Sequence, residues 1–325
     1  MMKTLLVVIL IAVAVSAWAQ DPPARPDVGT NGTNWSPPVP APTSGISTTD
    51  LNTLTPNDLV DALIGSGPDA PTISNITYNG ANVAAGTFTG GTGIIGFENG
   101  IILSSGNVAS VAGPNLVDDV TTDNGLSGDA DLDNLIPGYQ TYDATILEFD
   151  FECENLQVIS FSYVFASDEY NEYVNSDYND VFGFFLNGVN IALLPGGSTP
   201  VAINNVNCGD PYAPPGGTNC NYYINNDLDD GGGTIDTEMD GMTVVLVATA
   251  AVNPGVNHIK LAIADAGDHV LDSDILLKGE SFLCVTPSDA IPTLTEWGII
   301  IFSVLLLGWM ALVVIRRGRA ANVRT

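Results

Sequence analysis

Positive charge is the scarcest property of this chain, which has 8 Lys and Arg against 37 Asp and Glu among its 325 residues. Five of the bases lie near the two termini: Lys3, Arg316, Arg317, Arg319 and Arg324. Residues 21–290 therefore carry three bases and 36 acids, a net formal charge of −33. A surface of this sign repels phosphate groups, so we exclude nucleic acid as a partner. The natural counter-charge is a divalent cation.

Side chains that carry out catalysis are also scarce. The chain has two His and four Cys, and it contains no C-x-x-C metal spacing and no G-x-S-x-G nucleophile motif. His258 falls within an alternating strand pattern and is predicted to be a structural residue, whereas His269 lies in an acidic loop without a nucleophile motif. We therefore predict that the protein is not an enzyme. The alternative is a carbohydrate-active hydrolase that uses a carboxylate pair from Asp168, Glu169, Asp265 and Asp268.

The two ends of the sequence carry targeting signals. Residues 1–19 combine Lys3, an apolar run and a small-residue cleavage pattern, as in a secretory signal peptide that signal peptidase removes. Residues 298–315 contain no charged residue and would span roughly 27 Å as a helix, close to the hydrocarbon thickness of a membrane. Because basic residues stay in the cytoplasm, the tail at 316–325 places the rest of the chain outside. We therefore predict an exported protein with a C-terminal transmembrane helix.

A second signal precedes this apolar span, and we assign residues 287–297 as a linker that contains a sorting motif. The residues of the motif are Ile291, Pro292, Thr293, Leu294, Trp297 and Gly298. Followed by the apolar span and a cluster of Arg, they resemble the IPTL-CTERM sorting signal of Gram-negative bacteria. The resemblance implies that an exosortase-type transpeptidase recognises and removes the tail. An ordinary stop-transfer anchor is the alternative.

Between these signals the composition separates a spacer from a folded domain. Residues 20–50 contain seven prolines among Gly, Ser, Thr and Asn and little apolar material, so they predict a semi-extended linker. Residues 51–286 are long enough for one large domain. One short helix is expected near its start, with Thr55 as N-cap, Pro56 in the first position and Gly65 at the end.

Strand patterns dominate the rest of this domain. Apolar and polar residues alternate in residues 147–153 and 159–165, and the first of these strands has one acidic face. Residues 181–194 contain Asn187-Gly188 between two apolar runs, which predicts a type I′ hairpin. Residues 244–264 are expected to form a second hairpin. The whole pattern predicts an all-β fold, either a two-sheet β-sandwich or a jelly roll.

Several segments of this domain resemble the choice-of-anchor L domain family. They are residues 59–65, 96–106 and 165–188, with shorter matches at 239–243, 258–265 and 271–273. The resemblance covers nearly the whole of residues 51–286. It implies the architecture of the domain and a secreted protein with a C-terminal anchor, which agrees with the sorting motif. The resemblance does not assign a catalytic activity to the domain.

The cysteines of an exported chain are expected to form disulfide bonds. Three pairings of the four residues are possible: Cys153, Cys208, Cys220 and Cys284. Closeness in the sequence favours Cys208 with Cys220, around a loop rich in Pro and Gly, which leaves Cys153 with Cys284.

Acidic residues gather in two connections between predicted strands. The candidate calcium ligands there are Asp168, Glu169, Glu172, Asp177, Asp180, Asp265, Asp268 and Asp272, with Asp274 beside them. Calcium takes about six to eight oxygen ligands, and loops rich in Asp, Asn and Gly supply such oxygens. A solvated acidic rim without a bound ion is the alternative.

Two further acidic segments are expected to be flexible loops. Residues 129–134 imitate the first half of an EF-hand loop, but Asn134 replaces the turn glycine and Gln140 replaces the bidentate Glu. Residues 227–230 precede three glycines and are interpreted in the same way.

Together these features predict a non-enzymatic protein that is exported through the inner membrane of a Gram-negative bacterium and displayed on its envelope or surface. We expect a β-sandwich on a spacer, stabilised by Ca²⁺ and used in adhesion, with a glycan or a matrix component as its ligand. A lectin or a hydrolase that uses the acidic loops is the alternative.

Overall fold

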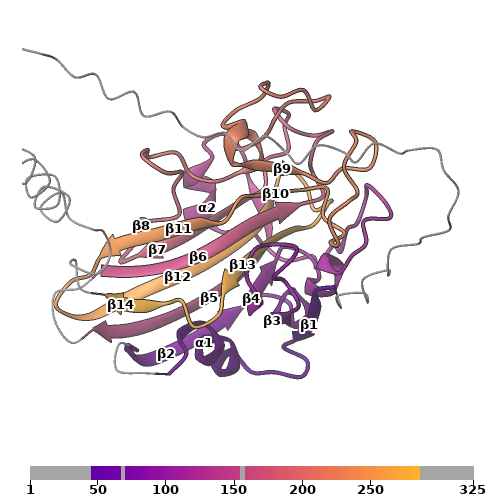
Figure 1. Ribbon diagram of the computed structural model, residues 1–325. Helices are drawn as coiled ribbons and strands as arrows, with labels where there is room; N and C mark the ends of the chain where they lie inside the picture. The colour runs from indigo at the N-terminus through magenta and orange to yellow at the C-terminus, as the bar shows by residue number, and fades with distance from the viewer. Residues whose placement is uncertain (1–44, 67–69, 154–157, 286–325) are drawn as a thin grey trace, which may run out of the picture. The chain divides into compact units, whose positions relative to one another are not determined.

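Two antiparallel β-sheets pack face to face in this computed structural model, which describes residues 45–66, 70–153 and 158–285 (Figure 1). The larger sheet has nine strands: β1 (Ser47–Asp50), β3 (Ala85–Thr89), β4 (Asn99–Ser104), β6 (Val158–Ser167), β9 (Tyr223–Asn225), β10 (Gly241–Thr243), β11 (Leu246–Ala251), β13 (Ser273–Lys278) and β14 (Leu283–Val285). The smaller sheet has five: β2 (Thr72–Asn79), β5 (Thr141–Cys153), β12 (Gly255–Ala266), β7 (Val181–Leu186) and β8 (Val189–Asn190). The predicted all-β, two-sheet sandwich is therefore confirmed.

Strand β6 is the centre of the larger sheet. The order of that sheet is β1-β3-β4-β13-β6-β10-β9, and β11 and β14 also pair with β6. The register places β13 and β14 along one edge of β6 and β10 and β11 along the other. In the smaller sheet the order is β2-β5-β12-β7-β8, with β12 paired to both β5 and β7.

The main hydrophobic core lies between the two sheets and is rich in aromatic rings. Phe161 and Tyr163 on β6 meet Phe182 and Phe184 on β7, with ring centroids 5.0 Å apart for Phe161 and Phe184 and 5.3 Å apart for Tyr163 and Phe182. Strand β5 turns its alternate apolar residues to this core and its acidic residues outward, as its sequence predicts. Each buried aromatic side chain removes a large apolar area from water, so this layer is the main source of stability.

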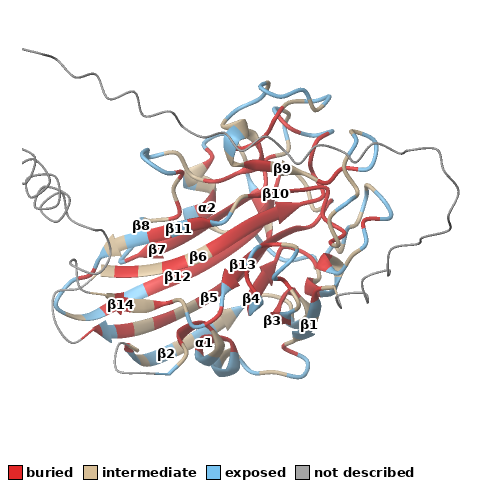
Figure 2. Ribbon diagram, in the orientation of Figure 1, coloured by how far each residue is buried: buried red, intermediate tan, exposed pale blue. Residues whose placement is uncertain are grey.

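A second, smaller core covers the other face of the larger sheet. It contains alternate residues of β6, β10 and β13, together with residues of the segments that cross over them: Val164, Ala166, Met239, Met242, Leu276, Val108 and Val111. Both faces of the larger sheet are therefore buried along β6 and β13. In Figure 2 this burial continues to the C-terminal end of β6.

The helices are short: α1 (Pro56–Ile64), α2 (Ala130–Leu135), and the 3-10 turns η1 (Asn82–Ala84), η2 (Val108–Val111), η3 (Ile203–Asn205) and η4 (Cys220–Tyr222). Helix α1 is the predicted one. The backbone N–H and the hydroxyl of Thr55 donate to the carboxylate of Asp58 at 2.8 and 2.7 Å, and Gly65 follows the last turn. The apolar face of α1 is buried against the main core.

The hairpin predicted around Asn187-Gly188 is present, with β7 and β8 as its strands. Asn187 and Gly188 have φ values of 49° and 81°, as a type I′ turn requires. The second hairpin, predicted in residues 244–264, is wrong. Strand β11 pairs with β6 in the larger sheet, whereas β12 pairs with β5 and β7 in the smaller one. The turn signal at Pro254 marks a crossing between the sheets.

Two acidic or polar segments are more ordered than their composition indicates. Residues 129–134 were expected to be a flexible loop, but α2 occupies 130–135, with Asp129 accepting the backbone N–H of Asp131 as an N-cap. The side chain of Lys260, on β12, bridges Asp129 and Asp131 and fixes this helix. Strand β1 lies within the segment 20–50, whose composition predicts a linker, because its backbone pairs with β3.

Both predicted disulfide bonds are present, and they lie in different parts of the fold. Cys153 at the end of β5 joins Cys284 on β14, so this bond connects the two sheets. Cys208 joins Cys220 and closes the loop between β8 and β9.

The predicted signal peptide, sorting motif and transmembrane helix lie in residues 1–44 and 286–325, outside the described residues. Within residues 45–66, 70–153 and 158–285, no helix is long and apolar enough to cross a membrane.

We expect the two disulfide bonds to contribute unequally to stability. Their sequence separations are 131 residues for Cys153–Cys284 and 12 residues for Cys208–Cys220. Chain entropy predicts a loss of about 5 kcal/mol for Cys153→Ser/Cys284→Ser and about 3 kcal/mol for Cys208→Ser/Cys220→Ser. Urea unfolding of both double variants measures this difference. A larger loss for the Cys208 and Cys220 pair would contradict it.

Candidate functional site

Three connections between the sheets meet at one end of the sandwich. Residues 168–180 join β6 to β7, residues 267–272 join β12 to β13, and residues 105–140 join β4 to β5. Each connection crosses from one sheet to the other. The register places the ends of β4 and β6 beside the start of β13, and the starts of β5 and β7 beside the end of β12, so the three connections pass over the same end. The two acidic connections singled out in the sequence therefore lie side by side.

Direct hydrogen bonds fasten the first two connections together. Asp180 accepts the backbone N–H of Ala266 at 2.8 Å and the hydroxyl of Ser273 at 2.7 Å. Gly267 makes the close approach possible, because it has φ of 113° and a Cβ there would lie 2.5 Å from the carbonyl oxygen of Asp177. The burial of Asp180 is therefore explained by these hydrogen bonds, which hold the two connections together.

The third connection is held by carboxylates as well. Asp272 accepts the backbone N–H of Thr122 at 2.7 Å and that of Asn107 at 3.2 Å. Asp143, near the start of β5, accepts from Asn124 and Leu126. The sequence reasoning did not identify Asp143, because it lies inside a strand and its partners are backbone groups.

Three of the buried acids face the space between the two sheets, and we call Glu169, Asp180 and Asp265 the inner carboxylates. All are at most 1% exposed. Within the described residues Oε2 of Glu169 and Oδ1 of Asp265 have no hydrogen-bond partner. Burial, and then the charge of Asp180, raises the pKa of both Glu169 and Asp265 well above the ordinary range. The ionised state of this group therefore requires a compensating positive charge.

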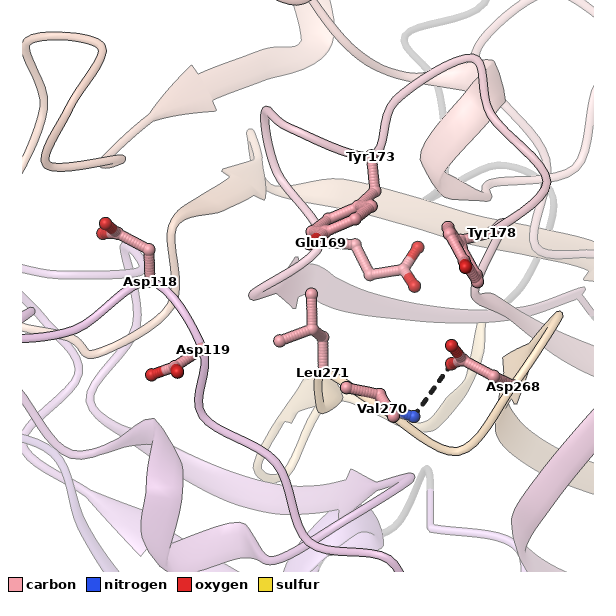
Figure 3. A pocket seen from close by; sticks show the side chains of 8 residues that line it. All are labelled: Asp118, Asp119, Glu169, Tyr173, Tyr178, Asp268, Val270 and Leu271. Atoms are coloured by element: carbon pink, nitrogen blue, oxygen red, sulfur yellow. Dashed lines mark hydrogen bonds between the residues drawn. The ribbon is translucent and has the colours of Figure 1, made fainter.

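Glu169 also lines a pocket of about 180 Å³ that opens to solvent. Figure 3 shows its carboxylate near the side chains of Tyr173 and Tyr178, whose ring centroids lie 5.5 Å apart in an edge-to-face contact. The other lining residues are Asp118, Asp119, Asp268, Val270 and Leu271. Asp268 accepts the backbone N–H of Val270 at 2.9 Å. The pocket thus combines two aromatic faces with four carboxylates.

Not all of the predicted ligands come together. Glu169, Asp180, Asp265, Asp268 and Asp272 lie around the meeting point of the connections.

Glu172 and Asp177 are instead exposed. Asp168 lies elsewhere, because its carboxyl faces Asp240 and Asp274 of the larger sheet. Adjacent residues that point to opposite sides of a strand end cannot share one small site.

Little positive charge is available to these acids. Among residues 45–66, 70–153 and 158–285 the bases are Lys260 and Lys278, and Lys260 lies 2.6 Å from Asp129 and 2.8 Å from Asp131. Lys278 is exposed on β13. No salt bridge from either Lys to the inner carboxylates occurs in the described part of the chain.

The two histidines are also accounted for by local contacts. His258 lies on the outer face of the smaller sheet, with Nδ1 2.8 Å from Asp150 and Nε2 3.3 Å from Glu148, as the prediction of a structural residue implies. His269 lies 3.1 Å from Asp143 and 3.7 Å from Asp123, and the ligand atoms of the three residues fall within 4.8 Å of one another. Within the described residues, these three are the group of acidic and His side chains whose ligand atoms lie close enough together to hold a metal ion, although the backbone also donates to both oxygens of Asp143.

The inner carboxylates offer the type of donor atom that calcium takes, although their oxygens do not lie within 4.8 Å of one another as a set of three in this structure. The donor atoms are carboxylate oxygens contributed by different loops, which is the ligand set that hard divalent cations take. The unpartnered oxygens of Glu169 and Asp265 are buried, so an ion bound to them would replace hydrogen bonds that the protein does not supply.

The fold and the targeting motif together define a surface-anchored, sorted protein. A family model for the choice-of-anchor L domain matches residues 47–283, and a model for the IPTL-CTERM motif matches residues 289–319. The chain therefore belongs to the choice-of-anchor L domain family and carries an IPTL-CTERM motif, which implies recognition by a sorting enzyme. Both resemblances seen in the sequence are confirmed. No curated protein and no solved structure matches the chain.

We expect the metal-free protein to lose stability as the pH rises from about 4 to about 8. Mainly because these groups are buried, the pKa of Asp272 is raised from 3.8 to about 6, and that of Asp240 is raised from 3.8 to about 8. The folded state therefore binds more protons than the unfolded state in this window, so its stability is greatest at low pH and falls as these groups ionise. Thermal melting in EDTA across this range measures the effect. A melting temperature that climbs steadily from pH 4 to pH 8 would contradict it.

Proposed function

We propose that this choice-of-anchor L domain is a non-enzymatic adhesion module whose acidic end is held in its active shape by calcium. The inner carboxylates are the observation that carries this proposal. They bring formal negative charges together in a buried space, and unpartnered oxygens of Glu169 and Asp265 remain there. Two like charges about 4 Å apart repel by roughly 4 kcal/mol near a protein surface. A divalent cation removes this repulsion and links loops that belong to different sheets.

The neighbouring pocket supplies a contact surface. Tyr173 and Tyr178 offer ring faces, and Asp118, Asp119 and Asp268 offer acceptors for hydroxyl groups (Figure 3). Binding sites commonly combine apolar and aromatic walls with a few convergent polar groups. We propose that a glycan or another hydroxyl-rich matrix component is the ligand, with calcium beside the pocket fixing the position of Glu169.

A carbohydrate-active hydrolase is the second candidate, and one observation favours it. Glu169 and Asp268 line the same pocket, and burial raises the pKa of Glu169, as a general acid requires. Asp168, one of the acids considered for such a pair, does not line the pocket. Release of sugar from a glycan panel, lost in Glu169→Gln, separates this class from an adhesion module.

We further propose that the chain is exported by its signal peptide across the inner membrane of a Gram-negative bacterium, anchored by the apolar segment 298–315, and then processed at the IPTL-CTERM motif. The family match at residues 289–319 supports recognition of this segment by a sorting enzyme. The part of the predicted linker that precedes β1 then displays the domain on the cell surface.

We expect the mature protein from wild-type cells to lack the apolar segment 298–315 and the basic tail. Mass spectrometry of the C-terminal peptide measures this, and Pro292→Ala in the sorting motif is expected to preserve the full tail. A wild-type protein that still ends in Arg324 and Thr325 would refute processing.

We expect millimolar calcium to raise the melting temperature of the EDTA-treated, full-length protein. At about 100 times the dissociation constant the stabilisation is about 2.7 kcal/mol, which corresponds to roughly 5 to 10 °C for a domain of this size. Glu169→Gln should reduce the rise, because it removes an inner carboxylate. Asp177→Asn is the matched control, since Asp177 is exposed and should leave the rise unchanged. The same melting temperature in EDTA and in calcium would remove calcium from the proposal.

A further inference from the structure

Two carboxylates gather at a single nitrogen of His269. Its Nδ1 lies 3.1 Å from Oδ2 of Asp143 and 3.7 Å from Oδ1 of Asp123. A ring N–H at this position can satisfy Asp143, whereas Asp123 lies beyond hydrogen-bond distance of the same nitrogen. The ligand atoms of the three residues fall within 4.8 Å of one another. A small cation in front of Nδ1 would therefore contact all three side chains.

The other histidine has the same kinds of neighbours in an arrangement that does not suit an ion. Asp150 lies 2.8 Å from Nδ1 of His258, and Glu148 lies 3.3 Å from Nε2. The two ring nitrogens point in different directions, so an ion bound at one of them lies away from the carboxylate at the other. His258 therefore serves as an internal control for what neighbouring carboxylates alone do to an imidazole.

The fold holds two of the three ligands in place. The backbone N–H of Asn124 donates to Oδ2 of Asp143 at 3.1 Å, and that of Leu126 donates to Oδ1. The ring of Tyr142 packs against that of His269, with the centroids 4.4 Å apart. Carboxylates and imidazoles that bind metals are commonly oriented by hydrogen bonds and packing of this kind. These contacts therefore prepare the ligands and leave lone pairs free for an ion.

Asp123 completes the ligand set from the solvent side. Its Oδ1 accepts the backbone N–H of Gly125 at 2.8 Å, which orients the carboxylate. The side chain of Asp123 is 67% exposed, whereas that of Asp143 is fully buried. An ion therefore has an entry path from solvent to a buried carboxylate.

Uncompensated negative charge beside this group points to a cation independently. Asp265 is 1% exposed, and its Oδ1 has no hydrogen-bond partner in the described residues. Burial first and the charge of Asp180 next raise the pKa of Asp265 well above the ordinary range, with the charge of Asp143 among the weaker causes. A hydrogen bond from Ser105 offsets part of this effect. Because Asp143 acts on Asp265, an ion bound to Asp143 would also favour the ionised form of Asp265.

The ligand set favours a transition ion over calcium. Calcium and magnesium take oxygen ligands, whereas zinc is bound by imidazole nitrogen together with carboxylate oxygen. Zinc lies about 2.0 to 2.2 Å from such ligands in a tetrahedral arrangement, which separates two ligand atoms by roughly 3.3 to 3.6 Å. The distances of 3.1 and 3.7 Å from Nδ1 of His269 lie close to this range. Three protein ligands leave the fourth position to water.

We propose that Asp123, Asp143 and His269 form a transition-metal site, with Zn²⁺ as the ion that fits it, at the acidic end of the sandwich. The site shares no ligand with the inner carboxylates and does not depend on the proposed function. Nδ1 of His269 binds the ion while Nε2 carries the ring proton, and one oxygen of each Asp completes the protein ligands. Without an ion, Nδ1 carries the proton and donates to Asp143.

The ion joins two connections that supply walls of the pocket. Asp123 lies in the connection between β4 and β5, which contributes Asp118 to the pocket (Figure 3). His269 lies in the connection between β12 and β13, between the lining residues Asp268 and Val270. A bound ion therefore fixes the separation of these two walls.

Zinc binding in the presence of calcium tests the site. The full-length protein, with its disulfide bonds intact, is treated with EDTA, dialysed into millimolar calcium chloride and titrated with zinc chloride, and bound zinc is counted per chain. Wild type is expected to bind one zinc ion, and His269→Gln and Asp123→Asn are each expected to weaken binding by at least about tenfold. Asp123→Asn keeps an oxygen that can accept from Gly125. His258→Gln is the matched control and should bind zinc as wild type does.

Hydrogen exchange gives a readout at the site itself. The backbone amides of Asn124 and Leu126 donate to Asp143, so an ion that holds this carboxylate should slow their exchange. Zinc is expected to slow it in wild type and in His258→Gln, and to leave it unchanged in His269→Gln. Far-ultraviolet circular dichroism confirms that each variant has folded.

Three results would overturn the proposal. They are a wild-type protein that binds no zinc, zinc that millimolar calcium displaces completely, and zinc binding that is lost in His258→Gln but kept in His269→Gln. None of them bears on the calcium site, because Glu169→Gln, the variant that tests it, lies outside this ligand set.

Discussion

The constraint on which the rest of this structure depends is the burial of carboxylates where almost no positive charge is available. Between the two sheets lie Glu169, Asp180 and Asp265, and on the outer face of the larger sheet lie Asp168, Asp240 and Asp274. The bases Lys260 and Lys278 lie elsewhere in the described residues. Folding must bring these acids together, because they lie at strand ends and in the crossings that join one sheet to the other. Hydrogen bonds compensate part of this charge, as at Asp180, and a cation or bound protons must compensate the oxygens that have no donor in the described residues.

The two ends of the sandwich therefore differ in what stabilises them. Away from the acidic crossings, the Cys153–Cys284 disulfide bond joins the two sheets covalently, and the aromatic core around Phe161 and Phe184 fills the space between them. At the acidic end, side chains that accept backbone N–H groups, such as Asp272, hold the loops, and other carboxylates remain unpartnered. Under the proposed function, calcium outside the cell would bind these carboxylates and make the acidic end rigid where the domain is displayed.

Much of the fold could be predicted from the sequence because the signals are local. Alternation identifies β5, Asn187-Gly188 identifies a type I′ turn, and Thr55 identifies the start of α1. Helix α2 was missed because its stability comes from Lys260, which is distant in the sequence. The site could be predicted in part, because the two acidic connections do meet. The sequence assigns Asp168 and Glu169 to one site, but alternation at the end of β6 turns their side chains to opposite faces of the sheet. Asp143 enters only through pairing between distant segments, which a single sequence does not reveal.

The measurement that tests this account most directly is a crystal structure of the protein grown in calcium chloride, with anomalous data collected at long wavelength. The account predicts an anomalous peak about 2.3 to 2.6 Å from the carboxylate oxygens of Glu169 and Asp265. Calcium-free density in which these carboxyls share protons through short mutual hydrogen bonds would contradict it.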